Sequence, residues 1–320
     1  MKRPGDGTRM DRLRTEHNNP ASTDLDRKSS LEIARIINRE DAKVAPAVKA
    51  ALPQIAEAID LIVAALKRRG RVIYVGAGTS GRIAALDAAE CPPTFNTDPR
   101  TVQFVMAGGT RALSSAVEAN EDSRALGQRE LAKRKPGSND VVIGIAASGR
   151  TPFTIAALQY ARRHGAKTVA VTCNRASPLA KAAHLAIVTE VGPEVIAGSS
   201  RMKAGSAQKM VLNILSSAAM ARLGYVYGNL MVNVHRKNQK LARRAIAILE
   251  RGAAVDKTTA RRLLRSAGNS VPVALIMRKA KVGRSEAARA LNSAQGNVRQ
   301  AIAQASRSNA AHRRDSAKTG

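Results

Sequence analysis

The feature that most constrains the fold is a series of short apolar runs in the middle of the chain. The runs that read as strands are RVIYVGAG (71–78), QFVMAGG (103–109), VVIGIAAS (141–148), TVAVTC (168–173) and HLAIVTE (184–190). Segments with helical spacing separate several of them. Unbroken apolar strands that alternate with helices are typical of a parallel sheet covered on both faces. We therefore predict an α/β fold, a three-layer αβα sandwich.

The rest of the chain divides by composition and by helix-breaking residues. Two long helices are expected after the sheet, at 199–223 and 229–251. Breaks at Gly268, Pro272, Gly283 and Gly296 indicate a small module of three helices. The predicted parts are a polar N-terminal arm (1–27), the sheet domain with its flanking helices (28–252), the small all-α module (253–305) and a basic disordered tail (306–320).

The charge of the chain is strongly positive but unevenly distributed. The formal net charge is +29. Residues 71–195 hold 15 Lys/Arg and 10 Asp/Glu, a net +5, whereas residues 253–320 hold 14 and 3, a net +11. The excess lies away from the sheet, and aromatic residues for base stacking make up only 2% of the chain. We therefore expect no functional nucleic-acid binding.

Cysteine, histidine and hydropathy limit the remaining classes. Cys91 and Cys173 form no disulfide framework and are expected to be buried thiols in a reducing compartment. The five histidines are scattered without ligand spacing, so we expect no metal site. An apolar signal region and an apolar run of about 18 residues are both missing, so we expect a cytoplasmic protein without membrane spans.

A glycine-rich turn follows the first strand. Gly78 and Gly81 allow the backbone to approach a ligand closely, and Thr79 and Ser80 add hydroxyl donors. The start of the following helix offers free N–H groups, which suits a phosphate. The turn has neither the Walker A ending nor G-x-G-x-x-G spacing. The structural alternative is a plain tight turn with a capping serine.

A similar turn follows the 141–148 strand. Ser148, Gly149 and Arg150 repeat the Ser-Gly-Arg of residues 80–82. A structural explanation is complete, because Ser148 can cap the next helix and Pro152 suits its first turn. The pairing of the two turns nevertheless predicts one phosphate site. It would be lined by the hydroxyls of Thr79, Ser80, Ser148 and Thr151.

Glu90 stands ten residues after Ser80, just before Cys91-Pro92-Pro93. We expect the prolines to end the helix there. A carboxylate at a helix C-terminus is unfavourable, which points to a functional use of Glu90. A second acidic group, Glu118, Glu121 and Asp122, reads on spacing alone as a charged helix face.

A third polar cluster follows the last strand. Glu194 lies at a strand end, where ligands bind in open parallel sheets. Ser199 and Ser200 could cap the long helix that begins near them.

Five motifs in this order resemble the N-acetylmuramic acid 6-phosphate etherases: GAGTSGR, LDAAECPPTF, ASGRTP, AGSSRMKAGSAQK and GNLMVNV. The resemblance covers residues 15–251, and ECPPTF is specific to etherases and their close relatives. It implies the sugar isomerase (SIS) phosphosugar-binding fold. It also implies cleavage of the D-lactyl ether of the substrate by elimination and water addition, without a metal or redox cofactor. Family members are homodimers with the site near the interface.

The resemblance also implies roles for single residues. Glu90 matches the proton donor to the leaving oxygen, and Glu121 matches the second catalytic carboxylate. Glu194 is expected to assist ring opening or proton transfer. The residues expected at the phosphosugar are Gly78, Thr79, Ser80, Ser148, Arg150, Thr151 and Glu194.

Three departures from the family pattern accompany these matches. Asn18 replaces an arginine, Phe153 replaces a common tyrosine and Asn233 replaces a usual aspartate. The alternatives are a non-catalytic sugar-phosphate regulator, like the glucokinase regulatory protein, a DNA-binding regulator and an aldose–ketose isomerase. The two glutamates argue against the first. Residues 1–70 show no convincing helix-turn-helix for the second, and ECPPTF argues against the third.

Overall fold

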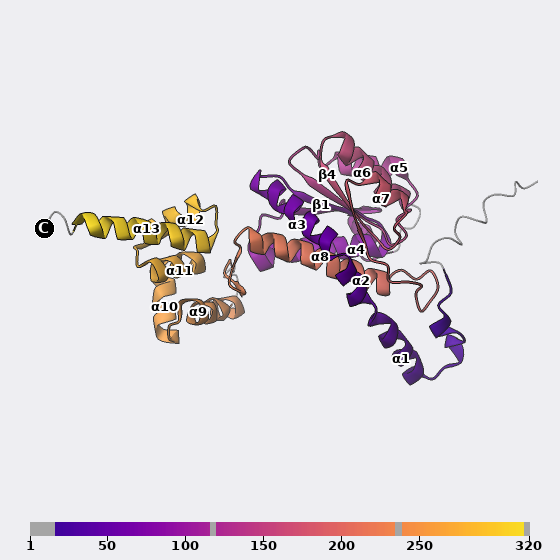
Figure 1. The fold of residues 1–320 in the computed structure, drawn as a ribbon, viewed down its shortest axis with the longest axis horizontal. Coiled ribbons are helices and arrows are strands. Elements are labelled where there is room, and N and C mark those ends of the chain that lie inside the picture. Colours follow the sequence, from indigo (N-terminus) through magenta and orange to yellow (C-terminus); the bar gives the residue numbers. More distant parts are fainter. Residues whose placement is uncertain (1–16, 116–119, 234–238, 317–320) are drawn as a thin grey trace, which may run out of the picture. The chain divides into compact units, whose positions relative to one another are not determined.

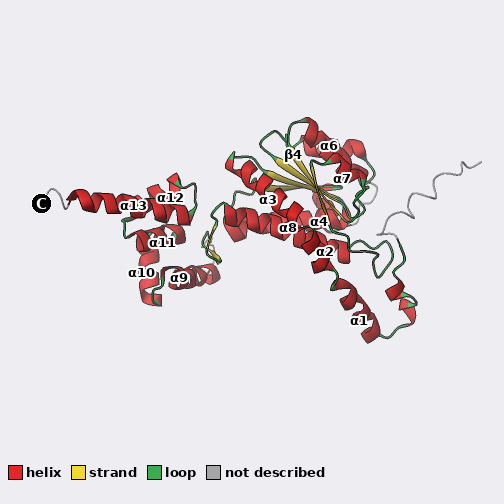
Figure 2. Ribbon diagram, viewed as in Figure 1, coloured by secondary structure: helices red, strands yellow, loops and turns green. Residues whose placement is uncertain are grey.

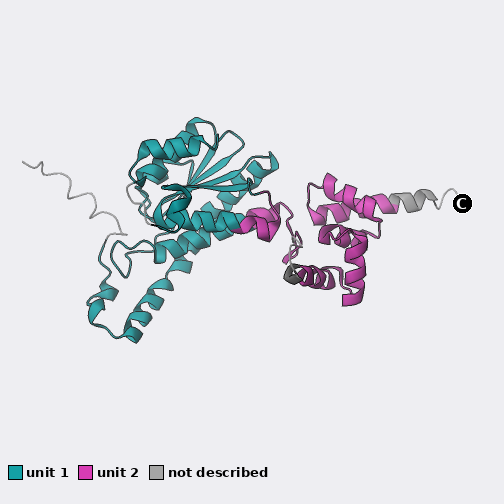
Figure 3. Cartoon of the chain, turned by 180° about the vertical axis from the view of Figure 1, so that it is seen from behind, with its two compact units in different colours: residues 1–89, 99–217 teal, residues 90–98, 218–320 magenta. Residues whose placement is uncertain are grey.

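The computed structural model describes residues 17–115, 120–233 and 239–316 (Figure 1). It divides into two compact units (Figure 3). The first unit consists of residues 1–89 and 99–217, and the second of residues 90–98 and 218–320. The helices α4 and α8 each cross from one unit to the other.

The first unit is built on a parallel five-stranded sheet with the order β2-β1-β3-β4-β5. All five strands coincide with predicted apolar runs, so this part of the prediction is confirmed. Their bounds are β1 Val72–Gly76, β2 Val102–Met106, β3 Val141–Ile145, β4 Lys167–Thr172 and β5 Leu185–Val188. The strand order switches between β1 and β3, because β2 is added on one side of β1 and the later strands on the other. Open parallel sheets bind ligands at such a switch point.

Helices cover both faces of this sheet (Figure 2). One face carries α6 and α7, and α3 packs on the other, which confirms the three-layer sandwich. The core between the sheet and α6 is aliphatic and includes Ile73, Val142 and Leu158, all fully buried. The helices of this unit are α1 Ser30–Asp41, α2 Val44–Ala50, α3 Leu52–Lys67, α5 Arg124–Ala132, α6 Pro152–Arg163 and α7 Pro178–Ala182, with α4 Gly78–Phe95 and α8 Lys203–Arg222 crossing between the units.

Local sequence signals explain the first helices. Ser29 caps α1 in a reciprocal arrangement with Glu32, a capping box. Pro53 lies in the first turn of α3, as expected of a proline that separates two helices. The apolar residues of α1 remain outside the core, and Leu31 is 58% exposed.

The end of α4 differs from the prediction. The helix does not stop at Cys91-Pro92-Pro93 but continues through both prolines to Phe95. Two N–H donors are missing from its last turns, yet Asn96 N still donates to Pro92 O at 2.9 Å. Asn96, with φ of 59°, then ends the helix in the left-handed conformation. Burial of Cys91 and Phe95 keeps this last segment packed.

The second unit is mainly helical. A hairpin of β6 Val226–Tyr227 and β7 Leu230–Met231 occupies the start of the region predicted as a long helix at 229–251. The module contains four helices after residue 253 where three were predicted, because each of the three glycine breaks separates two helices. The helices are α9 Gln239–Ala253, α10 Lys257–Ser266, α11 Val271–Ala280, α12 Arg284–Ser293 and α13 Val298–Ser316.

The predicted disordered tail is also helical over most of its length. The helix α13 continues to Ser316, and the residues after it lie outside the described part of the chain. Asn309 explains part of this extension, because its Nδ2 donates to the carbonyls of Ala280 at 3.0 Å and Lys281 at 3.1 Å. Among the described residues, no helix is both long enough and apolar enough to span a bilayer.

Candidate active site

The first Ser-Gly-Arg turn, residues 78–82, joins β1 to α4. Gly78 has φ of 51°, a left-handed conformation that favours glycine. Gly81 N donates to Ala77 O at 3.1 Å and closes the turn. Within the described residues, the hydroxyls of Thr79 and Ser80 have no hydrogen-bond partner. The first turn therefore presents two free hydroxyls at the N-terminus of a helix, where an anion is favoured.

The second Ser-Gly-Arg turn, residues 148–152, joins β3 to α6. The prediction that Ser148 caps α6 is wrong, because its Oγ accepts the N–H of Arg150 at 3.2 Å within the turn itself. The N-cap of α6 is Thr151, which makes no side-chain capping bond among the described residues. Pro152 stands in the first turn of the helix, as predicted. The Thr151 hydroxyl is therefore available to a ligand.

Hydrogen bonds from residues at the end of β4 hold the backbone of the second turn in place. Thr172 Oγ1 and Asn174 Nδ2 both donate to Ala147 O, at 3.2 Å and 3.1 Å. Gly149, with φ of 65°, packs so closely that a methyl group added there would lie 2.4 Å from the Ser177 side chain. The backbone of this turn is therefore fixed before any ligand arrives.

The arginines of the two turns have different surroundings. Arg82 donates from Nε to Ala112 O at 3.0 Å and from Nη2 to Ser115 O at 3.2 Å. Its guanidinium thus holds the backbone that leads towards Glu121. The buried Nε of Arg150 has no partner among the residues that the structure describes. Arg150 is therefore the better placed of the two to bind an anion, and its contact with a substrate stays a prediction.

Glu121 connects the two turns. A methyl group added at Gly78 would lie 2.9 Å from Glu121 Oε1, so the carboxylate lies against the first turn. The backbone carbonyl of Glu121 accepts the N–H of Phe153, in the first turn of α6, at 3.0 Å. Glu121 precedes α5 and is not on the charged helix face that its spacing indicated. Glu118 lies outside the described residues.

Glu90 is exposed near the C-terminal end of α4, in a segment that belongs to the second unit. It follows Ser80 by ten residues in one continuous helix. Ten residues of α-helix rise about 15 Å. The carboxylate of Glu90 and the hydroxyl of Ser80 in one chain therefore lie at different levels along α4.

Glu194 is fully buried and caps α8. Its carboxylate accepts the N–H groups of Lys203 at 3.0 Å and Ala204 at 2.9 Å. The capping role that the sequence indicated for Ser199 and Ser200 thus belongs to Glu194. Burial raises the pKa of Glu194 above its ordinary value, although the two N–H groups favour its charged form. Contact of Glu194 with a substrate stays a prediction.

A buried ion pair near this cap was not predicted. Lys203 Nζ contacts Glu40 Oε2 at 2.5 Å, and the two side chains are 1% and 2% exposed. Asn19 Nδ2 donates to the same carboxylate at 2.9 Å and to Pro193 O at 3.0 Å. Burial acts to raise the pKa of Glu40, but the bonds from Lys203, Lys43 and Asn19 outweigh it and lower the pKa to about 2.

This network fixes the start of α8, which lies beside the first turn. A methyl group added at Gly205 would be 3.5 Å from Thr79 Cγ2. The pair joins residues 163 positions apart, so no local pattern in the sequence identifies Glu40 as the partner of Lys203. The sequence signal for this ion pair is a single lysine, Lys203, followed by small residues at the start of a helix.

A second buried polar group supports the first turn from within α4. Asp87 accepts the hydroxyl of Tyr74 at 2.8 Å and that of Ser216 at 3.1 Å. Burial raises the pKa of Asp87 despite these bonds. The group links β1, α4 and α8, and sequence reasoning did not single out any of its three members.

The parallel sheet, with two hydroxyl-bearing turns at its switch point, defines a SIS-domain protein. The SIS domain family matches residues 132–218, and the glucokinase regulatory protein N-terminal SIS domain matches residues 54–162. A phosphoheptose isomerase of known structure from Francisella tularensis is 19% identical, with a TM-score of 0.46, over 61% of this chain and 100% of that chain.

More similar proteins identify the family. The N-acetylmuramic acid 6-phosphate etherase of Edwardsiella ictaluri is 52% identical over 84% of this chain and 89% of that protein. The etherase of Symbiobacterium thermophilum is 53% identical over 83% and 89%. Bacillus licheniformis etherase 1 is 45% identical over 91% and 96%. This chain belongs to the N-acetylmuramic acid 6-phosphate etherase family.

Proposed function

We propose that this protein is a carbon–oxygen lyase of cell-wall sugar recycling that cleaves the D-lactyl ether of N-acetylmuramic acid 6-phosphate. The products are N-acetylglucosamine 6-phosphate and D-lactate. Family membership at about half identity supports the reaction. The observation in the structure that carries the proposal is Glu121, whose carboxylate lies against the first turn and whose carbonyl binds the start of α6.

The two turns would bind the sugar phosphate. Thr79, Ser80 and Thr151 offer hydroxyls without partners among the described residues, and Arg150 offers a cation. The N-termini of α4 and α6 add N–H groups and partial positive charge. A phosphate held between the turns would bring the sugar close to the carboxylate of Glu121.

The proposed chemistry is an elimination followed by an addition. In the open-chain aldehyde the proton at C2 is acidic, and Glu121 removes it as a general base. Glu90 protonates the ether oxygen at C3, the C3–O bond breaks and D-lactate leaves. Water then adds at C3 of the unsaturated aldehyde, with Glu90 as its base. Each proton that a carboxylate takes in one half of the reaction is returned in the other half or to solvent.

The position of Glu90 favours a homodimer with a shared site. About 15 Å of helix separate Glu90 from Ser80, more than an open-chain hexose phosphate spans between phosphorus and C3. The exposed Leu31 leaves the apolar face of α1 available for a second copy. We therefore assign the acid at each site to the Glu90 of the other subunit.

Release of D-lactate in water enriched in oxygen-18 tests the reaction. We expect heavy oxygen at C3 of the sugar product, and a loss of about 10²- to 10⁴-fold in kcat for Glu90→Ala and for Glu121→Ala. Asp122→Ala, which removes an exposed neighbouring carboxylate, is the control and should keep its activity. No lactate release, with phosphosugar binding intact, would contradict the enzyme and favour a non-catalytic regulator.

Mixed dimers test the shared site. Glu90→Ala and Glu121→Ala subunits should each be inactive alone. In a shared site, a mixed dimer of the two variants still contains one site with both glutamates. If the glutamates of one site come from two subunits, equal mixing should restore about a quarter of wild-type activity, because half of the dimers are mixed. Absence of any recovery in co-expressed, verified mixed dimers would place both glutamates on one chain.

A further inference from the structure

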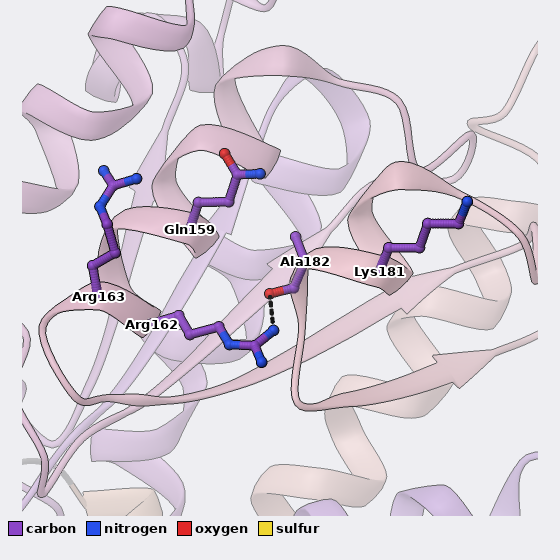
Figure 4. Close-up of a pocket in the computed structure, with 5 residues that line it drawn as sticks. All are labelled: Gln159, Arg162, Arg163, Lys181 and Ala182. Atoms are coloured by element: carbon purple, nitrogen blue, oxygen red, sulfur yellow. Dashed lines mark hydrogen bonds between the residues drawn. The ribbon is translucent and has the colours of Figure 1, made fainter.

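A cationic pocket lies near the amino ends of the strands, whereas the two turns lie at their carboxyl ends. It has a volume of about 500 Å³ and is lined by Gln159, Arg162, Arg163, Lys181 and Ala182 (Figure 4). These residues belong to the ends of α6 and α7, and from there the chain enters β4 and β5. The turns follow the other ends of the strands. The 12-residue helix α6 alone spans about 18 Å between its two ends.

In the part of the chain that the structure describes, no carboxylate pairs with the cations of this pocket. Some surface cations of the first unit pair with acids, as in Lys133–Glu130 and Arg175–Glu190. Among the described residues, none of Arg162, Arg163 and Lys181 makes such a pair. The Arg162 guanidinium is directed at the carbonyl of Ala182, 3.5 Å away, whereas the side chains of Arg163 and Lys181 point away from it on either side (Figure 4).

The electrostatic effect of this cluster extends to its neighbour His184. Burial lowers the pKa of His184, and the positive charges of Arg162 and Lys167 lower it further. The pocket also contains a polar group with hydrogen-bonding capacity. Gln159 accepts a bond from Arg124 at its Oε1, at 2.8 Å, and its Nε2 has no partner among the described residues.

Helix dipoles account for only part of this arrangement. Arg162 and Arg163 lie in the last turn of α6 and Lys181 in the last turn of α7, where cations are favoured. Each helix end carries about half a negative charge, so three full positive charges leave a net excess. The pocket is wide open to solvent, and a lone phosphate would reach few of its lining residues.

We propose that this pocket binds a small polyphosphate, free or carried on a nucleoside, at a site separate from the phosphosugar turns. Arg162 would contact one phosphoryl group, and Arg163 and Lys181 would turn towards the ligand to contact its neighbours, while the amide nitrogen of Gln159 would donate to a further oxygen. The proposal is independent of the reaction at the turns, because the two sites lie at opposite ends of the strands.

Calorimetric titration of the full chain with inorganic triphosphate, and with ATP, both without magnesium, tests the proposal. The test variants are Arg162→Gln/Lys181→Gln and the single charge reversal Lys181→Glu. The matched control is Lys67→Gln/Arg68→Gln, which removes two exposed cations from the end of α3. We expect at least about tenfold weaker triphosphate binding in the test variants and no change in the control.

Binding of N-acetylglucosamine 6-phosphate should be the same in all four proteins, which also confirms that the variants fold. A tighter complex with ATP than with triphosphate would identify a nucleoside carrier, and equal affinities would identify the polyphosphate alone. The proposal is wrong if wild type binds neither probe, if the control weakens binding as much as the test variants, or if N-acetylglucosamine 6-phosphate displaces the probe.

Discussion

The first turn (78–82) and the second turn (148–152) follow neighbouring strands and share Ser-Gly-Arg, yet they differ in what their side chains do. In the first turn, Arg82 holds the backbone of residues 112 and 115, and the hydroxyl of Ser80 is free within the described chain. In the second, Ser148 is used inside the turn and the Nε of Arg150 has no described partner. A repeated sequence therefore does not imply a repeated role for each residue.

The two turns are also supported differently. The first lies beside the start of α8, which Glu194 caps and the Glu40–Lys203 pair anchors. The second is held by neutral bonds from Thr172 and Asn174 at the end of β4. Support of the first turn should therefore depend on charge and pH, and that of the second should not.

Lys203→Met should have the largest effect on stability. It leaves Glu40 buried without its main partner, which costs about 3–5 kcal/mol. Lys43→Met is the matched control, because Lys43 binds the same carboxylate from a side chain that is 58% exposed and is worth about 0–1 kcal/mol. Urea denaturation at pH 7 measures both free energies of unfolding. Equal losses in the two variants would show that burial of the pair does not matter.

The same pair predicts a pH dependence. The pKa of Glu40 is about 2 in the folded protein and about 4.3 in an unfolded chain. A lowered carboxylate pKa stabilises the fold above the unfolded value, and this stability is lost as the pH falls from about 4.3 towards 2. In Glu40→Gln, the midpoint of urea unfolding should therefore fall less steeply between pH 5 and 2, the range in which unfolding of the wild type is coupled to proton uptake by Glu40. Parallel curves for the two proteins would contradict the assignment.

The next comparison is between Gly78 of the first turn and Gly149 of the second turn, both in the left-handed conformation. Gly149→Ala forces a methyl group against the Ser177 side chain at 2.4 Å and Thr172 Oγ1 at 2.7 Å, and should cost about 2–5 kcal/mol with backbone strain included. Gly78→Ala meets only the movable end of Glu121, so we expect about 1–2 kcal/mol from strain.

Gly149→Ala should lose more stability than Gly78→Ala, but Gly78→Ala should lose kcat beyond what its stability loss explains. Gly78→Ala displaces the carboxylate of Glu121, so its kcat should fall more than its loss of stability explains. Thermal unfolding and lactate release, measured on the folded fraction of each variant, separate the two effects. A folded Gly78→Ala protein with wild-type kcat would show that Glu121 does not act from this position.

The sequence was sufficient for the sheet because each strand is a local apolar run, and the central strands β1 and β3 are buried on both faces. It also marked the two turns by their glycine and hydroxyl residues, and Glu121 through motif resemblance. It failed where the deciding interaction is distant or unusual. Lys203 and Glu40 are far apart in the chain, and Asn309 ties α13 to the end of α11.

Two local signals were also misleading. Pro92 and Pro93 normally end a helix, but here burial of the neighbouring Cys91 and Phe95 keeps α4 together. Serine is a good helix-capping residue and Ser148 lies just before α6, yet its Oγ accepts the N–H of Arg150 within the turn. Propensity describes what a residue can do, and the surrounding packing decides among those options.

The smallest expected effects distinguish the two arginines. Arg82→Gln removes two hydrogen bonds to backbone carbonyls and should lower the free energy of unfolding by about 1–2 kcal/mol. Arg150→Gln should change stability by less than about 0.5 kcal/mol and raise KM about tenfold, a loss near 1.4 kcal/mol in binding, with kcat unchanged.

Urea denaturation and steady-state kinetics on both variants complete the comparison. The pattern we expect is a stability loss in Arg82→Gln with a near-normal KM, and the reverse in Arg150→Gln. If Arg82→Gln instead raised KM at unchanged stability, the first arginine would face the phosphate and the turns would be equivalent. Because Arg82 holds the backbone on the way to Glu121, a lower kcat at normal KM in Arg82→Gln would still agree with a supporting role.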